Sequence, residues 1–215
     1  AYACKSYHEN IERDWGARSD EHIFSPSYIY NQINDGTDSG APLEAAIAVV
    51  LENGCATLKT MPYTEDYHKK PDRKSHKEAL EYKAKSFASV NPQNPESIKE
   101  ILRGGNAVLI GMFLYENFYY YSGGIYDGIS GAYLGGHDMC IVGYDDSRNA
   151  FKIINSWGRA WGEGGYVWVD YDTFTQYCVV AMVMYDEVVH QPAEPAVPVN
   201  ITASSGSFPD KIKLT

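Results

Sequence analysis

The hydrophobic residues of this chain change their spacing at Ala107. Before that position, apolar residues recur every three or four places, which is the spacing of one helix face. After it, β-branched and aromatic runs are separated by Gly and Asp-Asp turns, a pattern typical of short strands. We therefore expect an α+β fold in which a helical lobe precedes a lobe built from an antiparallel, barrel-like sheet.

Four amphipathic helices are expected before the change in spacing. The first covers residues 1–15 and ends at Gly16, but Ala1-Tyr2-Ala3 offers no capping side chain, so the chain is expected to begin inside this helix. Proline at a first helical turn and an apolar periodicity identify the others. They begin at Ser25-Pro26, at Ala41-Pro42 and at Pro95.

Six strands are expected after the change, each bounded by turn residues. They lie within residues 107–115, 123–128, 137–146, 150–157, 165–171 and 177–185. The proline-rich stretch 191–199 is then expected to be an extended linker, and residues 200–215 to be the start of a further β-type module of the same polypeptide. The segment 1–190 would form the principal domain.

Composition excludes several classes of protein. A net charge of −10 argues against nucleic-acid binding, which needs clustered Lys and Arg. Residues 69–85 are locally basic, and we interpret them as a solvated helix face. No apolar stretch is long enough to span a bilayer, and four scattered cysteines suggest neither a metal site nor a disulfide scaffold, so no membrane, metal or cofactor is expected. A secreted or cell-surface location is favoured without a motif that decides it.

Two polar side chains occur where strands meet loops. His137 follows two glycines at the start of an apolar run, and Asn155 ends another run eighteen residues later, just before Trp157. A carboxamide oxygen can accept the ring N–H of an imidazole and hold it in one tautomer. A tryptophan beside that bond would shield it from water and so strengthen it.

These segments resemble the signatures of the papain-like cysteine peptidases, of a bacterial type. The run from Asn155 to Tyr166 (NSWGRAWGEGGY) is similar to the asparagine signature of the family, and Gly136 to Tyr144 (GHDMCIVGY) to its histidine signature. The resemblance implies that His137 and Asn155 are catalytic, that Trp157 supports them, and that backbone groups of Gly136 and of Gly40, in a glycine-containing turn, bind a peptide or protein substrate.

The sequence departs from this family at the nucleophile. The family places its cysteine at the start of the first long helix, in a motif like C-G-S-C-W-A-F preceded by a glutamine, and neither occurs here. We expect the cysteine to lie a few residues before Ala1, in a segment that this chain lacks, and the chain itself to be inactive.

Three alternatives remain. The first is a catalytically inactive papain-like module that binds peptides or acts as a scaffold, and the second is an exopeptidase of the same family. The third is that Cys4 substitutes for the nucleophile. Cys4 shares a helix face with Ile11 and Trp15, so we expect a buried, structural thiol instead.

Overall fold

The computed structural model describes residues 1–13 and 19–186, which form two compact units. The helical unit comprises Ala1–Phe87 together with the end of the last strand, from Met184. The β unit comprises Ala88–Val183. The chain therefore passes from one unit to the other after Phe87 and returns after Val183.

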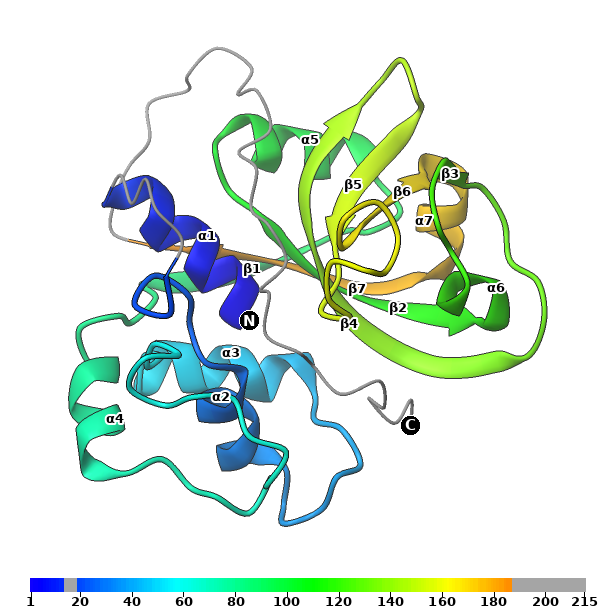
Figure 1. The fold of residues 1–215 in the computed structure, drawn as a ribbon. Helices are drawn as coiled ribbons and strands as arrows, with labels where there is room; N and C mark the ends of the chain where they lie inside the picture. Colours follow the sequence, from blue (N-terminus) through cyan, green and yellow to red (C-terminus); the bar gives the residue numbers. More distant parts are fainter. Residues whose placement is uncertain (14–18, 187–215) are drawn as a thin grey trace. The chain divides into compact units, whose positions relative to one another are not determined.

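The described residues of the helical unit form four helices (Figure 1). They are α1 (Tyr2–Glu12), α2 (Pro26–Ile33), α3 (Leu43–Glu52) and α4 (Arg73–Ala79). Ser25 caps α2 by accepting a hydrogen bond from the amide of Tyr28, and α2 and α3 pack on each other. Apolar side chains from all four helices, together with Phe24 and Met61 from loops, form the core of the unit: Cys4, Tyr7, Phe24, Tyr28, Ile29, Leu43, Ile47, Val50, Met61 and Ala79.

Gly54 allows the chain after α3 to approach α4 closely. Its φ is +77°, and a Cβ at this position would lie 1.7 Å from the carbonyl oxygen of Ala79. Only glycine fits both requirements. The helix stop that the sequence indicates at Gly54 is thus also a packing requirement.

Helix α1 buries an unusual number of polar side chains. Lys5, His8 and Glu9 are 0%, 6% and 2% exposed. The ammonium of Lys5 contacts the carboxylate of Glu9 at 2.7 Å and also that of Asp186, which follows the last strand. A buried charge needs such partners, so this ion cluster ties α1 to the end of the described chain.

The β unit is organised around a seven-stranded sheet in the order β1-β7-β2-β4-β5-β6-β3. Four strand pairs are antiparallel: β2 with β4, β2 with β7, β4 with β5, and β5 with β6. Strand β3 pairs with β6 in parallel. Strands β1 and β7 each cross a boundary between the units. The strands are β1 (Ser86–Val90), β2 (Val108–Tyr115), β3 (Ile125–Tyr126), β4 (Tyr133–Asp145), β5 (Ala150–Ile154), β6 (Tyr166–Asp170) and β7 (Cys178–Tyr185).

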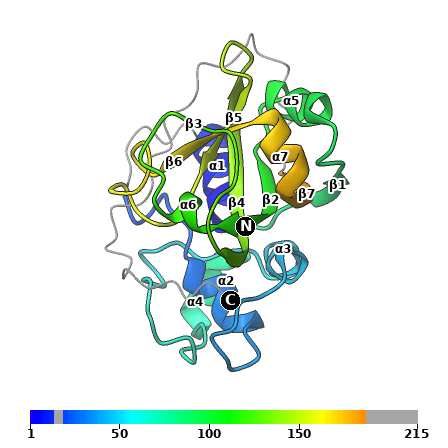
Figure 2. The ribbon, with the colours of Figure 1, turned by 90° about the vertical axis from the view of Figure 1, so that its right-hand side faces the viewer.

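Three helices complete the β unit: α5 (Pro95–Arg103), α6 (Glu116–Tyr119) and α7 (Tyr171–Tyr177). Helices α5 and α7 pack on the sheet, and α6 follows directly on β2 (Figure 2). Helix and sheet bury one hydrophobic cluster, whose fully buried members include Ile98, Ile110, Met112, Leu114, Phe118, Phe151, Val167 and Phe174.

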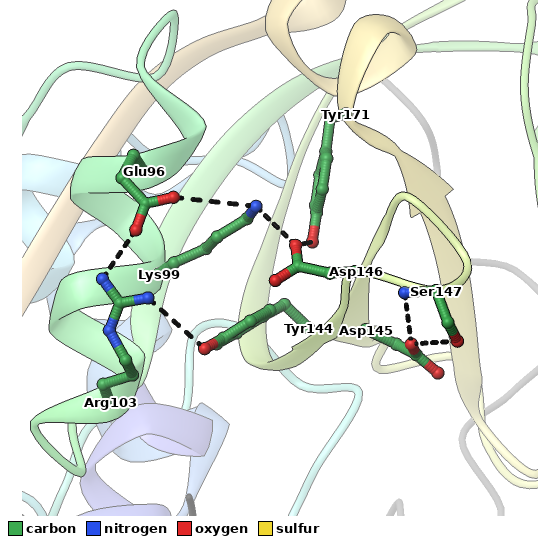
Figure 3. Close-up of polar contacts among 8 residues, drawn as sticks. All are labelled: Glu96, Lys99, Arg103, Tyr144, Asp145, Asp146, Ser147 and Tyr171. Carbon is green, nitrogen blue, oxygen red and sulfur yellow. Dashed lines mark hydrogen bonds and ion pairs between the residues drawn. The ribbon is translucent and has the colours of Figure 1, made fainter.

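A polar network fastens α5 to the turn between β4 and β5 (Figure 3). Lys99 bonds Asp146 at 2.5 Å and lies 4.2 Å from the centre of the Tyr171 ring, and Tyr171 donates to the same carboxylate. Arg103 pairs with Glu96 at 2.6 Å. Most of these charges are exposed, so each pair is expected to contribute about 1 kcal/mol or less to stability.

The sequence predictions of structure are largely confirmed. The second, third and fourth expected helices are α2, α3 and α5, and the six expected strands are β2 to β7, although β4 begins four residues before the expected His137. The first helix ends at Glu12 rather than near residue 15, because the backbone of Arg13 leaves the helical conformation. The basic stretch 69–85 contains α4, with most of its side chains exposed.

Some elements and segments fall outside those predictions. Strand β1 and helices α6 and α7 were not expected, since each is short or directly continues a strand. Trp15, Gly16, the linker 191–199 and the module 200–215 lie outside the described residues, as does the boundary at 190. Among the described helices, none combines the length and the hydropathy that crossing a membrane requires.

Candidate active site

The antiparallel register of β4 and β5 brings two distant chain segments together. Cys140 pairs with Ile154, and Ile141 with Ile153. Extending this register past the end of β5 brings residues 155–157 alongside 137–139. The eighteen-residue separation of His137 and Asn155 therefore becomes a contact between neighbouring strands.

His137 and Asn155 are hydrogen-bonded. Nε2 of His137 lies 2.9 Å from Oδ1 of Asn155, and the backbone N–H of Ser156 donates to the same oxygen at 2.7 Å. Because the Ser156 amide is a donor, it identifies this atom as the carboxamide oxygen, and Nε2 must then carry the proton. Nδ1 of the neutral ring is consequently the basic nitrogen.

The surroundings of His137 favour its neutral form. Burial of the ring among its neighbours lowers the pKa of His137 below the ordinary histidine value, and the hydrogen bond with Asn155 opposes that shift only in part. Asn155 is itself 4% exposed and carries no charge. The site thus holds an oriented imidazole that can accept a proton at neutral pH.

Trp157 covers the pair. Its ring centroid lies 5.0 Å from that of His137, with the planes inclined by 33°. The expected geometry, a hydrogen-bonded His137–Asn155 pair with Trp157 packed against it, is confirmed.

Further aromatic side chains support Trp157. Phe118 meets it edge-on at 5.8 Å and Trp161 at 5.2 Å, while Tyr119 contacts it at 5.8 Å. The indole of Trp161 donates to the carbonyl oxygen of Tyr119 at 3.0 Å. The sequence did not suggest a role for these three residues. Trp161 could have been noticed, because it lies within the run from Asn155 to Tyr166 that resembles the family signature.

The loop after β5, which carries Trp157 and Trp161, is held by a glycine turn and by a hydrogen bond to another segment. Gly162 has a φ of +56°, and a Cβ there would lie 2.4 Å from the carbonyl oxygen of Tyr166. Glu163 accepts a hydrogen bond from the amide of Gly124 at 2.8 Å. The loop after β5 is therefore anchored to the segment before β3, which holds Trp157 in place.

The two glycines expected to bind a peptide lie in different units. Gly136 is exposed on β4, opposite Phe113 in the register, with open space where a side chain would be. Gly40 belongs to the helical unit, has a φ of +90°, and donates its amide to the hydroxyl of Tyr30 at 3.3 Å. A substrate-binding role for either residue stays a prediction.

All four cysteines are buried. Burial raises the pKa of the thiols of Cys55 and Cys178, the latter to about 12, so neither is a ready nucleophile at neutral pH. Cys4 is 0% exposed, which confirms its expected burial, and its interaction with His8, which raises the pKa of that imidazole, was not expected from the sequence. The spacing of four residues between Cys4 and His8 on one helix could have predicted that the two side chains lie close together.

Acidic side chains gather at one place in the helical unit. Oxygen atoms of Glu9, Glu12 and Asp186 lie within 4.8 Å of one another. Lys5 already bridges two of these carboxylates and Arg13 pairs with Glu9, so cations of the chain itself engage the cluster. The arrangement is therefore described as an ion cluster.

Comparison with known proteins gives a consistent result. The family described as papain family cysteine protease matches residues 14–187. Cathepsin B-like protease 1 of Arabidopsis thaliana is 32% identical over 80 residues, which are 36% of this chain and 21% of that protein. Fruit bromelain of Ananas comosus is 51% identical over 55 residues, which are 24% of this chain and 15% of bromelain.

A solved structure extends the likeness over most of the chain. Xylellain, a cysteine protease from Xylella fastidiosa, superposes with a TM-score of 0.73 at 27% identity, covering 87% of this chain and 77% of that one. The expected α+β fold is confirmed by this neighbour. The matched parts span about a fifth or less of the two curated relatives' own lengths.

Proposed function

Because the chain belongs to the papain family of cysteine proteases, we propose that its β unit carries the acid–base half of a cysteine endopeptidase site. In this proposal His137 moves the proton and Asn155 orients the ring. The observation that carries it is the bond of 2.9 Å between Nε2 of His137 and Oδ1 of Asn155, which leaves Nδ1 as the basic nitrogen.

The reaction follows from these roles. A cysteine thiolate, its proton held on His137, attacks the carbonyl carbon of a peptide bond and forms a tetrahedral intermediate. The C–N bond then breaks as the imidazolium gives its proton to the leaving nitrogen. A water molecule, losing a proton to His137, attacks the thioester, and the acid and the thiol are released.

The nucleophile is proposed to come from a polypeptide segment ahead of Ala1. Two observations support this: the family motif around the cysteine does not occur in the chain, and all four cysteines present are buried. At the start of α1 a thiol would meet the positive end of the helix dipole, which favours the thiolate. Backbone groups of Gly40 and Gly136 are proposed to bind the extended substrate.

Two versions of the protein test the proposal. The 215-residue chain is expected to leave a fluorogenic peptide intact, whereas a form preceded by the residues that the gene encodes upstream is expected to hydrolyse it. Iodoacetamide should abolish that hydrolysis, and His137→Ala in the longer form should lower kcat by about 100-fold or more.

The same experiment separates the alternative. A Ser or Gly encoded a few residues ahead of Ala1, with no hydrolysis by the longer form, would favour an inactive peptide-binding or scaffold module. Iodoacetamide-sensitive cleavage by the 215-residue chain would instead contradict the need for an external cysteine.

A further inference from the structure

Helix α4 and the turn before it present a group of exposed cations in the helical unit. Residues 69–77 contain five Lys or Arg side chains and a single Asp, although the whole chain has a net charge of −10. We call four of these cations the basic face. They are Lys69, Arg73, Lys74 and Lys77, and all of them are exposed.

The cations of the basic face are not neutralised by ion pairs. Within residues 1–13 and 19–186, none of them lies within ion-pair distance of a carboxylate. By contrast, Lys59, Lys99 and Arg103 each pair with a carboxylate at the surface. The positive charge of the basic face is therefore available to an anionic ligand.

The two carboxylates that lie beside the basic face in the sequence are engaged within the unit. Asp72 accepts hydrogen bonds from the amide of Ser75 at 2.7 Å and from its hydroxyl at 2.8 Å. Glu78 accepts from the amide of Thr57 at 3.0 Å and from the hydroxyl of Thr60 at 2.9 Å. These acids are used to cap α4 and to fasten it, while the cations point to solvent.

The backbone that carries the basic face is held from below. The amide group of Asn31, which is 1% exposed, donates to the carbonyl oxygens of Asp66 at 3.1 Å and Lys69 at 2.8 Å. In return, the ammonium of Lys70 donates to the carbonyl oxygen of Asn31. The turn before α4 is thus fixed, so a ligand would not have to order its backbone.

The size of the basic face fits a short acidic segment. Arg73 and Lys77 are four residues apart on α4, so their Cα atoms are separated by about 6 Å along the helix axis. An extended peptide covers this distance with about two residues. The remainder of the chain is negatively charged and would repel a long polyanion that ran beyond the face. A short run of Asp or Glu is therefore favoured over a nucleic acid or an anionic polysaccharide.

We infer that the basic face binds an acidic segment of a protein substrate, away from the peptide bond that is cleaved. This inference rests on the proposed function, because a peptidase brings a polypeptide to this chain. Complementary charge on the two surfaces would speed association and select proteins that carry such a segment. The substrate class is thus narrowed to proteins with a short cluster of carboxylates.

Binding to the 215-residue chain tests the inference without hydrolysis. The probes are acetyl-tetraglutamate amide, acetyl-tetraglutamine amide and a sulfated heparin disaccharide with the same net charge as the glutamate peptide. Backbone amide resonances of residues 69–77 report both the affinity and the place of binding. The glutamate peptide is expected to shift these resonances at low salt and to lose its effect at about 0.5 M salt, because screening weakens exposed charge pairs.

Matched double variants locate the charge. Lys74→Gln with Lys77→Gln removes two cations of the basic face, and should weaken binding of the glutamate peptide about 2- to 30-fold, the range for two exposed ion pairs. Lys83→Gln with Lys85→Gln removes the same charge outside the basic face and should keep the affinity. All four side chains are exposed, so both double variants should fold.

Several results would overturn the inference. A face that is merely solvated would bind the glutamate and glutamine peptides equally. Equal losses of affinity in the two double variants, resonance shifts confined to other residues, or binding that persists at about 0.5 M salt would also contradict it. Tighter binding of the heparin disaccharide than of the glutamate peptide would contradict the choice of a protein partner.

This inference and the proposed function fail separately. Hydrolysis by the longer form, without any preference of the 215-residue chain for the glutamate peptide, would contradict the inference alone. A preference for the glutamate peptide without hydrolysis by the longer form would contradict the proposed function alone.

Discussion

Two histidines, one in each unit, have opposite kinds of neighbour. His8 of α1 interacts electrostatically with Cys4 and with the carboxylates of Asp186 and Glu12, whereas His137 of β4 hydrogen-bonds the neutral amide of Asn155. Burial acts on both rings to lower the pKa. For His8 the electrostatic interactions with Cys4, Asp186 and Glu12 outweigh burial and raise the pKa above the ordinary value, but for His137 burial prevails.

The difference shows what an amide partner contributes. An amide can orient an imidazole as well as a carboxylate does, without stabilising the charged ring to the same degree. His137 is therefore held in position, and its lowered pKa favours the neutral form that can accept a proton. His8, surrounded by acidic groups, takes part in a charged cluster that links α1 to Asp186.

Removing a charge from the cluster around α1 should have the largest effect. Lys5→Met removes the buried ammonium that bridges the carboxylates of Glu9 and Asp186, and is expected to lower the free energy of unfolding by about 3–5 kcal/mol. Urea denaturation measures this. The control is Lys59→Met, whose pair with Glu21 is exposed and should be worth less than about 1 kcal/mol. A similar loss of unfolding free energy in both variants would contradict the expected difference between the buried and the exposed ion pair.

Removing the neutral partner of His137 should have an intermediate effect. Asn155→Leu leaves the ring N–H of His137 and the amide of Ser156 without their acceptor, at a cost of about 1–3 kcal/mol in unfolding free energy. The pKa of His137 should fall further, because the lost bond favoured the charged ring. Urea denaturation and NMR titration of the ring measure the two effects, and an unchanged titration would contradict the bond.

Asn155→Asp would make the site of His137 resemble that of His8. A carboxylate hydrogen-bonded to the ring stabilises the imidazolium, so the pKa of His137 should rise above the ordinary histidine value. NMR titration follows His137 in the variant, with the signal of His8 as an internal reference. A pKa that stayed below the ordinary value would show that burial dominates whatever the partner.

The two histidines should also give opposite pH dependences of stability. The pKa of His8 is raised in the folded state. Its contribution to the free energy of unfolding is therefore full below the ordinary histidine pKa and is lost as the pH rises through the folded-state pKa. His137 has a lowered folded pKa, so its contribution is present above the ordinary value and is lost as the pH falls through the folded value. The unfolding free energies of His8→Gln and His137→Gln are measured on both sides of the ordinary histidine pKa. The stability lost in His8→Gln should be larger below that pKa, and the stability lost in His137→Gln should be larger above it.

The polar network on α5 should matter least. Glu96→Gln weakens exposed pairs with Arg103 and Lys99, and is expected to change the unfolding free energy by about 0.5 kcal/mol or less at moderate salt. Denaturation at low and high salt measures it. A loss above about 2 kcal/mol would mean that this network stabilises the β unit as strongly as a buried one.

The sequence by itself determined the local elements and the identity of the site. Proline and serine at helix starts predicted α2 and α5, and Gly54 predicted the end of α3, because these residues act on their own stretch of backbone. His137, Asn155 and Trp157 could be selected because they interrupt apolar runs in a pattern that a family shares. Helices α6 and α7 were missed because no local signal separates them from the strands they continue.

Only the tertiary structure decided how those residues act. The register of β4 and β5 sets the 2.9 Å bond, and a shift by one residue would turn Asn155 to the other face of the sheet. The direction in which each histidine pKa is shifted depended on its neighbours: Asp186, far from His8 along the chain, acts on that ring, whereas the neutral amide of Asn155 faces His137. Burial and electrostatics act through space, so a pattern along the chain could name the two rings but could not assign their pKa values.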